Sequence, residues 1–185
     1  EAGTALTTGD NNVFVGYGAG DATTTVPNVN AFGYAALGAN TTGQSLCAFG
    51  SYALDANETA NDNSAFGHVA LGANTTGTGN NAFGSSSLDA CTTGGYNVAM
   101  GNNAGGAITT GSNNVLIGNS AGDGFDTEHN NTAIGSGALG GASYAATANT
   151  AIGYLAGNVM TSGASSVIIG AYAGDALTSG GSNTF

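Results

Sequence analysis

The chain contains neither lysine nor arginine, while 11 of its 185 residues are acidic, which gives a formal net charge of −11. Nucleic acids and anionic membrane surfaces attract proteins through cationic groups that replace counterions. We therefore expect neither of them as a partner.

Long apolar runs are also missing. No stretch of 18 apolar residues occurs, so we expect no membrane insertion. No targeting segment is visible, and the chain opens at Glu1 in the middle of a repeat. That start is compatible with a cleaved leader peptide and equally with a fragment of a longer protein. Either explanation allows the protein to be exported.

Proline occurs once and only 6% of the residues are charged, whereas 34 are glycine and 41% are hydrophobic. This composition is far from that of an ordinary globular domain. It is also too hydrophobic for a disordered chain. The explanation is a repeat, because one glycine recurs every 17 residues, with a single spacing of 18 before Gly153. These anchor glycines are Gly16, Gly33, Gly50, Gly67, Gly84, Gly101, Gly118, Gly135, Gly153 and Gly170.

A fixed period of this length predicts a repeat architecture. We number positions in each repeat from the anchor glycine. Position −1 is always large and apolar, and we predict that it forms the core ladder of the molecule. Its residues are Val15, Phe32, Phe49, Phe66, Phe83, Met100, Ile117, Ile134, Ile152 and Ile169.

Alanine dominates positions −2 and +3, and we leave open whether these small residues face neighbouring chains or line a narrow interior. Position −4 is mostly asparagine, from Asn12 to Asn149. Amides stacked in register can hydrogen-bond along the stacking axis. We expect an internal ladder there, with a ligand-binding row of surface asparagines as the alternative.

Each repeat therefore predicts one short strand before the anchor glycine, a second around positions +3 and +4, and a polar Thr-Thr-Gly turn. Two short strands and two corners form one coil of a solenoid, in which stacked coils share a continuous core. We predict an all-β, parallel β-solenoid (β-roll or β-helix) of about ten to eleven 17-residue coils. Residues 1–185 form a single array with both ends in mid-repeat.

The repeat resembles a known family. Residues 131–135 and 149–153 read Asn-Thr-Ala-Ile-Gly, and residues 63–67 read Asn-Ser-Ala-Phe-Gly. These motifs resemble the head repeats of trimeric autotransporter adhesins and, more closely, arrays in phage-type tail fibres and related bacterial surface proteins. The resemblance implies a left-handed parallel β-roll, three chains packed side by side, and exposure outside the cell.

Several side chains are candidates for chemistry. Aspartate alternates with glycine at position +5 along most of the array. The aspartates are Asp21, Asp55, Asp89, Asp123 and Asp175. Turn formation and charge spacing are the preferred explanation; calcium binding is the alternative, although that ion takes six to eight oxygen ligands. No other cofactor is expected.

The Asn-x-Ser/Thr rule marks four possible glycosylation acceptors: Asn40, Asn57, Asn74 and Asn130. Chance matches in a repeat rich in asparagine and threonine are the alternative. The threonine pairs invite an ice-binding hypothesis. Against it, adjacent strand residues point to opposite sides, and the outward column would be broken at Glu58, Asp126 and Ser143.

Cys47 and Cys91 lie about two and a half repeats apart. A disulfide needs Cα atoms within about 7 Å, and two solenoid turns already span about 9.5 Å. We expect no intrachain bridge and leave an interchain bridge open. His68 and His129 have no nucleophile or acid in a repeated relation to them, so we expect no enzyme.

The sequence thus favours an extracellular structural and adhesive rod, part of a fibre or fibril on a cell or virion surface. We expect self-association, side by side as a trimer, end to end, or both, and leave open a cell-surface or matrix receptor. The alternatives are a ligand-binding solenoid, for ice, calcium or a glycan, and the shaft of a phage tail fibre.

Overall fold

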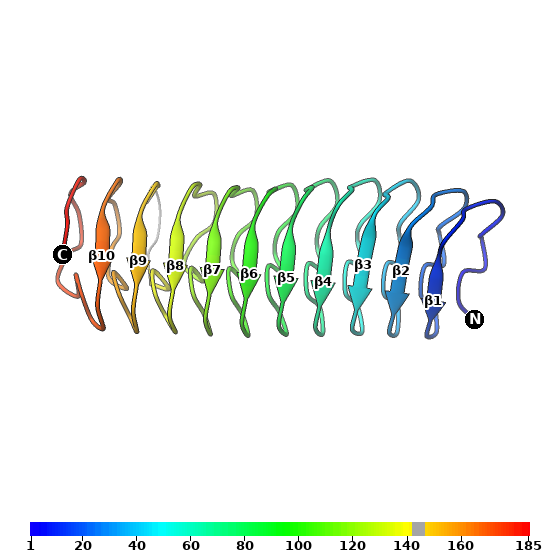
Figure 1. Cartoon of the computed structure of the whole chain (residues 1–185), viewed down its shortest axis with the longest axis horizontal. Coiled ribbons are helices and arrows are strands. Elements are labelled where there is room, and N and C mark those ends of the chain that lie inside the picture. Colours follow the sequence, from blue (N-terminus) through cyan, green and yellow to red (C-terminus); the bar gives the residue numbers. More distant parts are fainter. Residues whose placement is uncertain (142–146) are drawn as a thin grey trace.

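The computed structural model of the chain describes residues 1–141 and 147–185. Within them, ten short strands stack in sequence order as one parallel sheet along a straight rod (Figure 1). The strands are β1 (Val13–Val15), β2 (Val29–Phe32), β3 (Leu46–Phe49), β4 (Ser64–Phe66), β5 (Asn81–Phe83), β6 (Val98–Met100), β7 (Val115–Ile117), β8 (Thr132–Ile134), β9 (Thr150–Ile152) and β10 (Val167–Ile169).

The predicted parallel β-solenoid is therefore confirmed, with about nine turns in place of the ten to eleven predicted. Each strand residue pairs with the residue one repeat further on, as Ala48 does with Ala65. The spacing of 18 is absorbed between β8 and β9, where Thr132 pairs with Thr150. We call each turn of the solenoid a rung.

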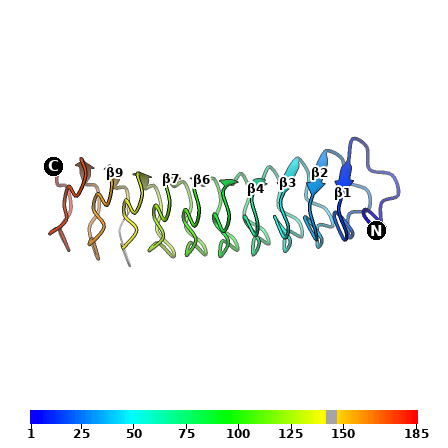
Figure 2. The same cartoon turned by 90° about the horizontal axis from the view of Figure 1, so that it is seen from below.

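The strands occupy only one long side of the rod, and turns make up the rest of each rung (Figure 2). The second strand predicted around positions +3 and +4 is wrong. At position +4, Leu54, Leu71 and Leu88 all have φ of 52°, in the left-handed region. A leucine in that region costs about 1 kcal/mol of backbone strain, which its burial offsets.

The anchor glycine is where one rung touches the next. Gly67 has φ of +146°, and a Cβ atom built on it would lie 2.4 Å from the carbonyl oxygen of Gly84. No side chain fits such a contact. This close approach explains why glycine recurs without exception at the period of the repeat.

The prediction that position −1 forms the core is wrong. Every one of these residues is exposed or only half-buried: Val15, Phe32, Phe49, Phe66, Phe83, Met100, Ile117, Ile134, Ile152 and Ile169. Because strand side chains alternate between faces, positions −4 and −2 point inward and positions −3 and −1 point outward.

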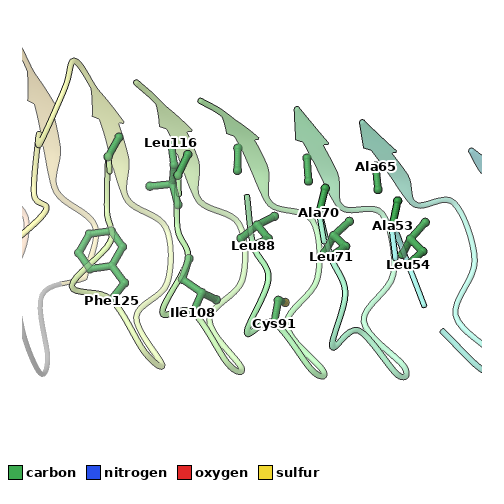
Figure 3. Packing of buried hydrophobic residues seen from close by; sticks show 14 of the residues in the cluster. Ala53, Leu54, Ala65, Ala70, Leu71, Leu88, Cys91, Ile108, Leu116 and Phe125 are labelled. Carbon is green, nitrogen blue, oxygen red and sulfur yellow. The ribbon is translucent and has the colours of Figure 1, made fainter. Parts of the chain in front are cut away.

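The real core consists of alanine at −2, alanine at +3 and leucine or glycine at +4, together with position +7. In Figure 3, Ala65 on the strand and Ala70 and Leu71 on the opposite turn fill the interior between them. In most rungs the strand contributes a methyl group at position −2 and the turn contributes the large side chain; where the strand residue is large, as Leu116 and Ile168 are, glycine stands opposite it at +4. The two alanine columns therefore line the interior, one of the two alternatives left open.

In most rungs core volume is balanced between positions +4 and +7; in the first, Gly20 and Thr23 are both small and Phe14 at position −2 fills the space. Where +4 is leucine, position +7 is a smaller residue, as Asn74 is beside Leu71; where +4 is Gly105, position +7 is Ile108. A Cβ on Gly105 would lie 2.6 Å from Leu116 Cδ1 and 3.2 Å from Ile108 Cδ1. Leu116 at position −2 of the next rung and Ile108 at position +7 therefore together take the space that leucine occupies elsewhere.

Candidate functional site: the outer face of the strands

The outward columns at positions −1 and −3 form one surface, which we call the outer strand face. Phe32, Phe49, Phe66 and Phe83 stack on successive rungs, with ring centroids 4.4, 5.1 and 4.8 Å apart and planes within 13° of parallel. Met100 and four isoleucines continue the column to the end of β10. A single apolar row thus runs along all ten strands.

Position −3 lies beside this row on the same face. Its residues are Val13, Asn30, Cys47, Ser64, Asn81, Val98, Val115, Thr132, Thr150 and Val167. None of the ten described strands contains a charged residue. The outer strand face is therefore neutral and largely apolar on a chain of net charge −11, because all acidic side chains lie elsewhere on the rungs.

Stacking alone gives the phenylalanines part of their stabilisation, about 1 kcal/mol per ring pair beyond area burial. Yet Phe49 and Phe83 each keep 38% of their surface exposed, and Ile169 keeps 56%. Exposed contiguous apolar surface of this kind marks interaction sites. Parallel sheets, moreover, are nearly always covered on both faces, and here the inner face alone is covered.

The asparagine ladder predicted at position −4 is confirmed. The Oδ1 of Asn63 accepts a hydrogen bond of 2.8 Å from the backbone N–H of Asn80 on the next rung, and its Nδ2 donates one of 2.8 Å to the carbonyl of Gly77. Asn80 repeats the pattern toward Asn97 and Gly94. These amides are fully buried, so they form part of the interior and bind nothing outside.

Three of the four predicted glycosylation acceptors are wrong for the same reason. Asn40, Asn57 and Asn74 stand at position +7 inside the rod and have no exposed surface. Asn57 Nδ2 donates to Asn40 Oδ1 at 3.1 Å, and Asn74 Nδ2 donates to Asn57 Oδ1 at 3.0 Å. A glycan cannot occupy a buried amide, so Asn130, which is exposed, is the one predicted acceptor still accessible.

The aspartates at +5 are spaced along the rod. In the described part of the chain, no three histidine, cysteine, aspartate or glutamate side chains come close enough to share a metal ion. Burial raises the pKa of Asp55, and burial also raises the pKa of Asp89 and Asp123, against the hydrogen bonds each receives. Asp21 differs, because its hydrogen bonds from Thr4 lower its pKa.

The two histidines lie apart on the surface. His129 accepts a hydrogen bond of 2.9 Å at Nδ1 from the backbone N–H of Ser112, and His68 meets the ring of Tyr52 edge-on. Of the cysteines, Cys91 is fully buried, and burial raises its pKa to about 11. Cys47 is half-buried on the outer strand face, and burial raises its pKa as well.

The threonine turn differs from its prediction. Both threonines of the pair lie on the outside, at positions +8 and +9. The +8 column is interrupted by Glu58 and Asp126, as expected, and Ser143 lies outside the described residues. The +9 column, which sequence reasoning missed, is unbroken over eight rungs and exposed throughout: Thr8, Thr25, Thr42, Thr59, Thr76, Thr93, Thr110 and Thr127.

Among the described residues, only in the +8 column do the threonine hydroxyls form hydrogen bonds to the next rung. At +8, the hydroxyl of Thr75 donates to the carbonyl of Thr92 at 3.1 Å, and that of Thr92 donates to Thr109 at 3.1 Å. The backbone N–H of Thr76 donates to the same carbonyl of Thr92 at 3.2 Å. Counting residues at +9 for an unbroken column would have found this feature in the sequence.

No helix in the described ranges is long and apolar enough to cross a membrane. Comparisons of the chain with protein-family models, with curated proteins and with solved structures found no match.

Proposed function

We propose that the protein is a structural rod of a surface fibre, and that copies of it pack side by side through the outer strand face. The observation that carries this proposal is the exposed apolar row on a sheet whose strands contain no charge. Burying one such side chain contributes about 2 kcal/mol, and the row offers one on every strand.

A second copy of the chain is the partner that fits this surface best. Each rod has net charge −11 and no cation, so two rods repel each other wherever acidic faces meet. They approach at least cost with their neutral strand faces together and their acidic side chains turned outward. A cationic partner would instead be drawn to the acidic sides of the rod.

Matching rung spacing also favours a copy of the chain. The strands of one rod repeat about every 4.8 Å, so side chains of one face can interdigitate with those of an identical face over the whole length. The resemblance to adhesin heads and tail fibres implies three chains in such a bundle, outside the cell or on a virion. Joined rods would present a long, stiff and repetitive adhesive surface.

Sedimentation velocity tests this assembly. We would compare the native chain with Phe83→Asp, which places a charge on the outer strand face, and with Thr76→Asp, which adds the same charge on the threonine turn. Circular dichroism first checks that both variants keep the fold. We expect the native chain and Thr76→Asp to sediment as assemblies and Phe83→Asp as a 17.6 kDa monomer. A native chain that stays monomeric at every concentration rejects the proposal.

A second candidate function is ice binding, and the unbroken +9 threonine column favours it. Position +8, whose hydroxyl has an internal partner, tolerates Glu58 and Asp126, whereas position +9, which has none among the described residues, stays threonine over eight rungs. An exposed hydroxyl and methyl repeated about every 4.8 Å suit an ordered water lattice. Thermal hysteresis that falls in Thr76→Tyr and persists in Thr4→Tyr supports this function; its absence in the native chain excludes it.

A further inference from the structure

Tyrosines gather at one corner of the rod. Of the seven in the chain, five stand at positions +1 and +2, just after the anchor glycine: Tyr17, Tyr34, Tyr52, Tyr154 and Tyr172. They occur in two runs on consecutive rungs, three in the first and two in the second. Elsewhere in the described residues, Tyr96 stands alone on the opposite edge of the strand, and Tyr144 lies outside them.

Within each run the rings touch. The ring centroids of Tyr17 and Tyr34 lie 5.7 Å apart, those of Tyr34 and Tyr52 5.2 Å, and those of Tyr154 and Tyr172 5.2 Å. All five rings are exposed, from 39% for Tyr52 to 70% for Tyr17. Each run is therefore a contact between phenols that reagents in water can reach.

In the Tyr34–Tyr52 and Tyr154–Tyr172 contacts the phenol ends, and not only the rings, face one another. Burial raises the pKa of Tyr52, and the charge and hydrogen bond of Tyr34 add to that rise. The neighbouring charge of Tyr154 raises the pKa of Tyr172, followed by burial and a hydrogen bond between the two hydroxyls. Two phenols whose hydroxyls meet also bring together the ring carbons beside those hydroxyls.

We propose that these paired tyrosines are sites of oxidative cross-linking, which joins successive rungs through dityrosine. The oxidant is a haem peroxidase with hydrogen peroxide, which takes one electron and one proton from each phenol. The two tyrosyl radicals then form a carbon–carbon bond between their ortho carbons, and each ring regains its aromaticity as the ortho hydrogen moves to the oxygen. One peroxide is reduced to two waters for each dityrosine formed.

The chemistry of the chain leaves tyrosine as the residue for such a link. Lysine is absent, which excludes lysine-derived cross-links, and Cys91 is buried. The rungs are otherwise joined by hydrogen bonds and packing, which an exposed end can lose one rung at a time. A bond from one rung to the next closes a loop of 17 or 18 residues and restricts that loss.

The link forms within one chain, so it does not depend on side-by-side packing. The test treats dilute folded protein with peroxidase and peroxide, and follows dityrosine fluorescence. Cleavage at acidic residues then isolates peptide 22–55, which carries both Tyr34 and Tyr52. We expect this peptide to lose two hydrogens, with a yield that does not vary with protein concentration and is several-fold higher than in urea-unfolded protein.

Two variants complete the experiment. Tyr34→Phe removes the partner of both Tyr17 and Tyr52, and we expect it to abolish the loss of two hydrogens in peptide 22–55. Tyr96→Phe is the matched control and should leave that product unchanged. Equal yields in folded and unfolded protein, coupling mainly between chains, or a product that persists in Tyr34→Phe would each overturn the proposal.

Discussion

Asn74 donates a hydrogen bond of 3.0 Å from Nδ2 to the Oδ1 of Asn57, one rung below, at a place fully shielded from water. Asn40, Asn57 and Asn74 form a second amide ladder, at position +7, and this ladder ends at Asn74 because position +7 of the next rung is Cys91. As a result, Asn74 Oδ1 is buried and finds no hydrogen-bond partner. A buried acceptor of this kind costs about 1–3 kcal/mol.

Extending the ladder should therefore stabilise the rod. Cys91→Asn places a donor beside Asn74 Oδ1, and Leu88 already supplies the leucine that accompanies Asn74 and Asn57 in their own rungs. We expect a gain of about 1 kcal/mol in the free energy of unfolding, measured by urea denaturation. Cys91→Ala is the control for loss of the thiol, and a Cys91→Asn chain no more stable than that control contradicts the ladder account.

The position of the core can be tested by two truncations on the same rung. Leu71 is fully buried and Phe66 is not. Removing a buried leucine leaves a cavity and costs about 2–5 kcal/mol, so Leu71→Ala should lower the free energy of unfolding by that amount. Phe66→Ala should cost the isolated chain much less and act mainly on assembly. The reverse order of losses would restore the original prediction of a phenylalanine core.

The sequence predicted the rungs because the requirement at the anchor glycine is absolute: at Gly67 a Cβ has no room. It predicted the amide ladder for a similar reason, since the Asn63 side chain both accepts from Asn80 and donates to Gly77. The core face was not predictable from hydrophobicity, because strand alternation allows either Ala65 or Phe66 to point inward. Width decides between them: the interior accepts a methyl group from the strand because Leu71 comes from the other side.

The glycosylation rule failed at Asn57 because a three-residue pattern carries no information on burial. The inward orientation of position +7 could have been recognised from its size, which in most rungs is large where the residue at +4 is small and small where it is large. Leu54 accompanies Asn57, whereas Gly122 accompanies Phe125, and only inward residues exchange volume in this way. The strand predicted at +4 failed because leucine seldom adopts positive φ, and burial in the core outweighs that preference here.

Acid should stabilise this protein, against the usual trend. Burial raises the folded-state pKa of Asp55, Asp89 and Asp123 above the unfolded value of about 3.9. The folded state therefore binds more protons, and the free energy of unfolding rises as pH falls through the raised folded pKa toward the unfolded one. Asp21, whose pKa is lowered, opposes this at lower pH, from the unfolded pKa downward.

Urea denaturation between pH 7 and pH 4 measures this dependence. We expect the midpoint to move to higher urea as pH falls, and Asp55→Asn to raise the midpoint at pH 7 while flattening the pH dependence. Asp10→Asn, at an exposed site, is the control for the change in net charge. A midpoint that falls steadily with acid would show that these carboxylates are stabilised in their charged form.

The reactivity of Cys47 tests the central claim most directly, and it needs no mutation. Cys47 lies on the outer strand face beside Phe49, whereas Cys91 is buried in the core, so a thiol reagent reports on that face alone. If copies of the chain pack through this face, alkylation of Cys47 should proceed at a measurable rate in dilute protein and should slow many-fold as the concentration rises. A rate that stays the same at every concentration would contradict the account, because the apolar row would then remain open to water.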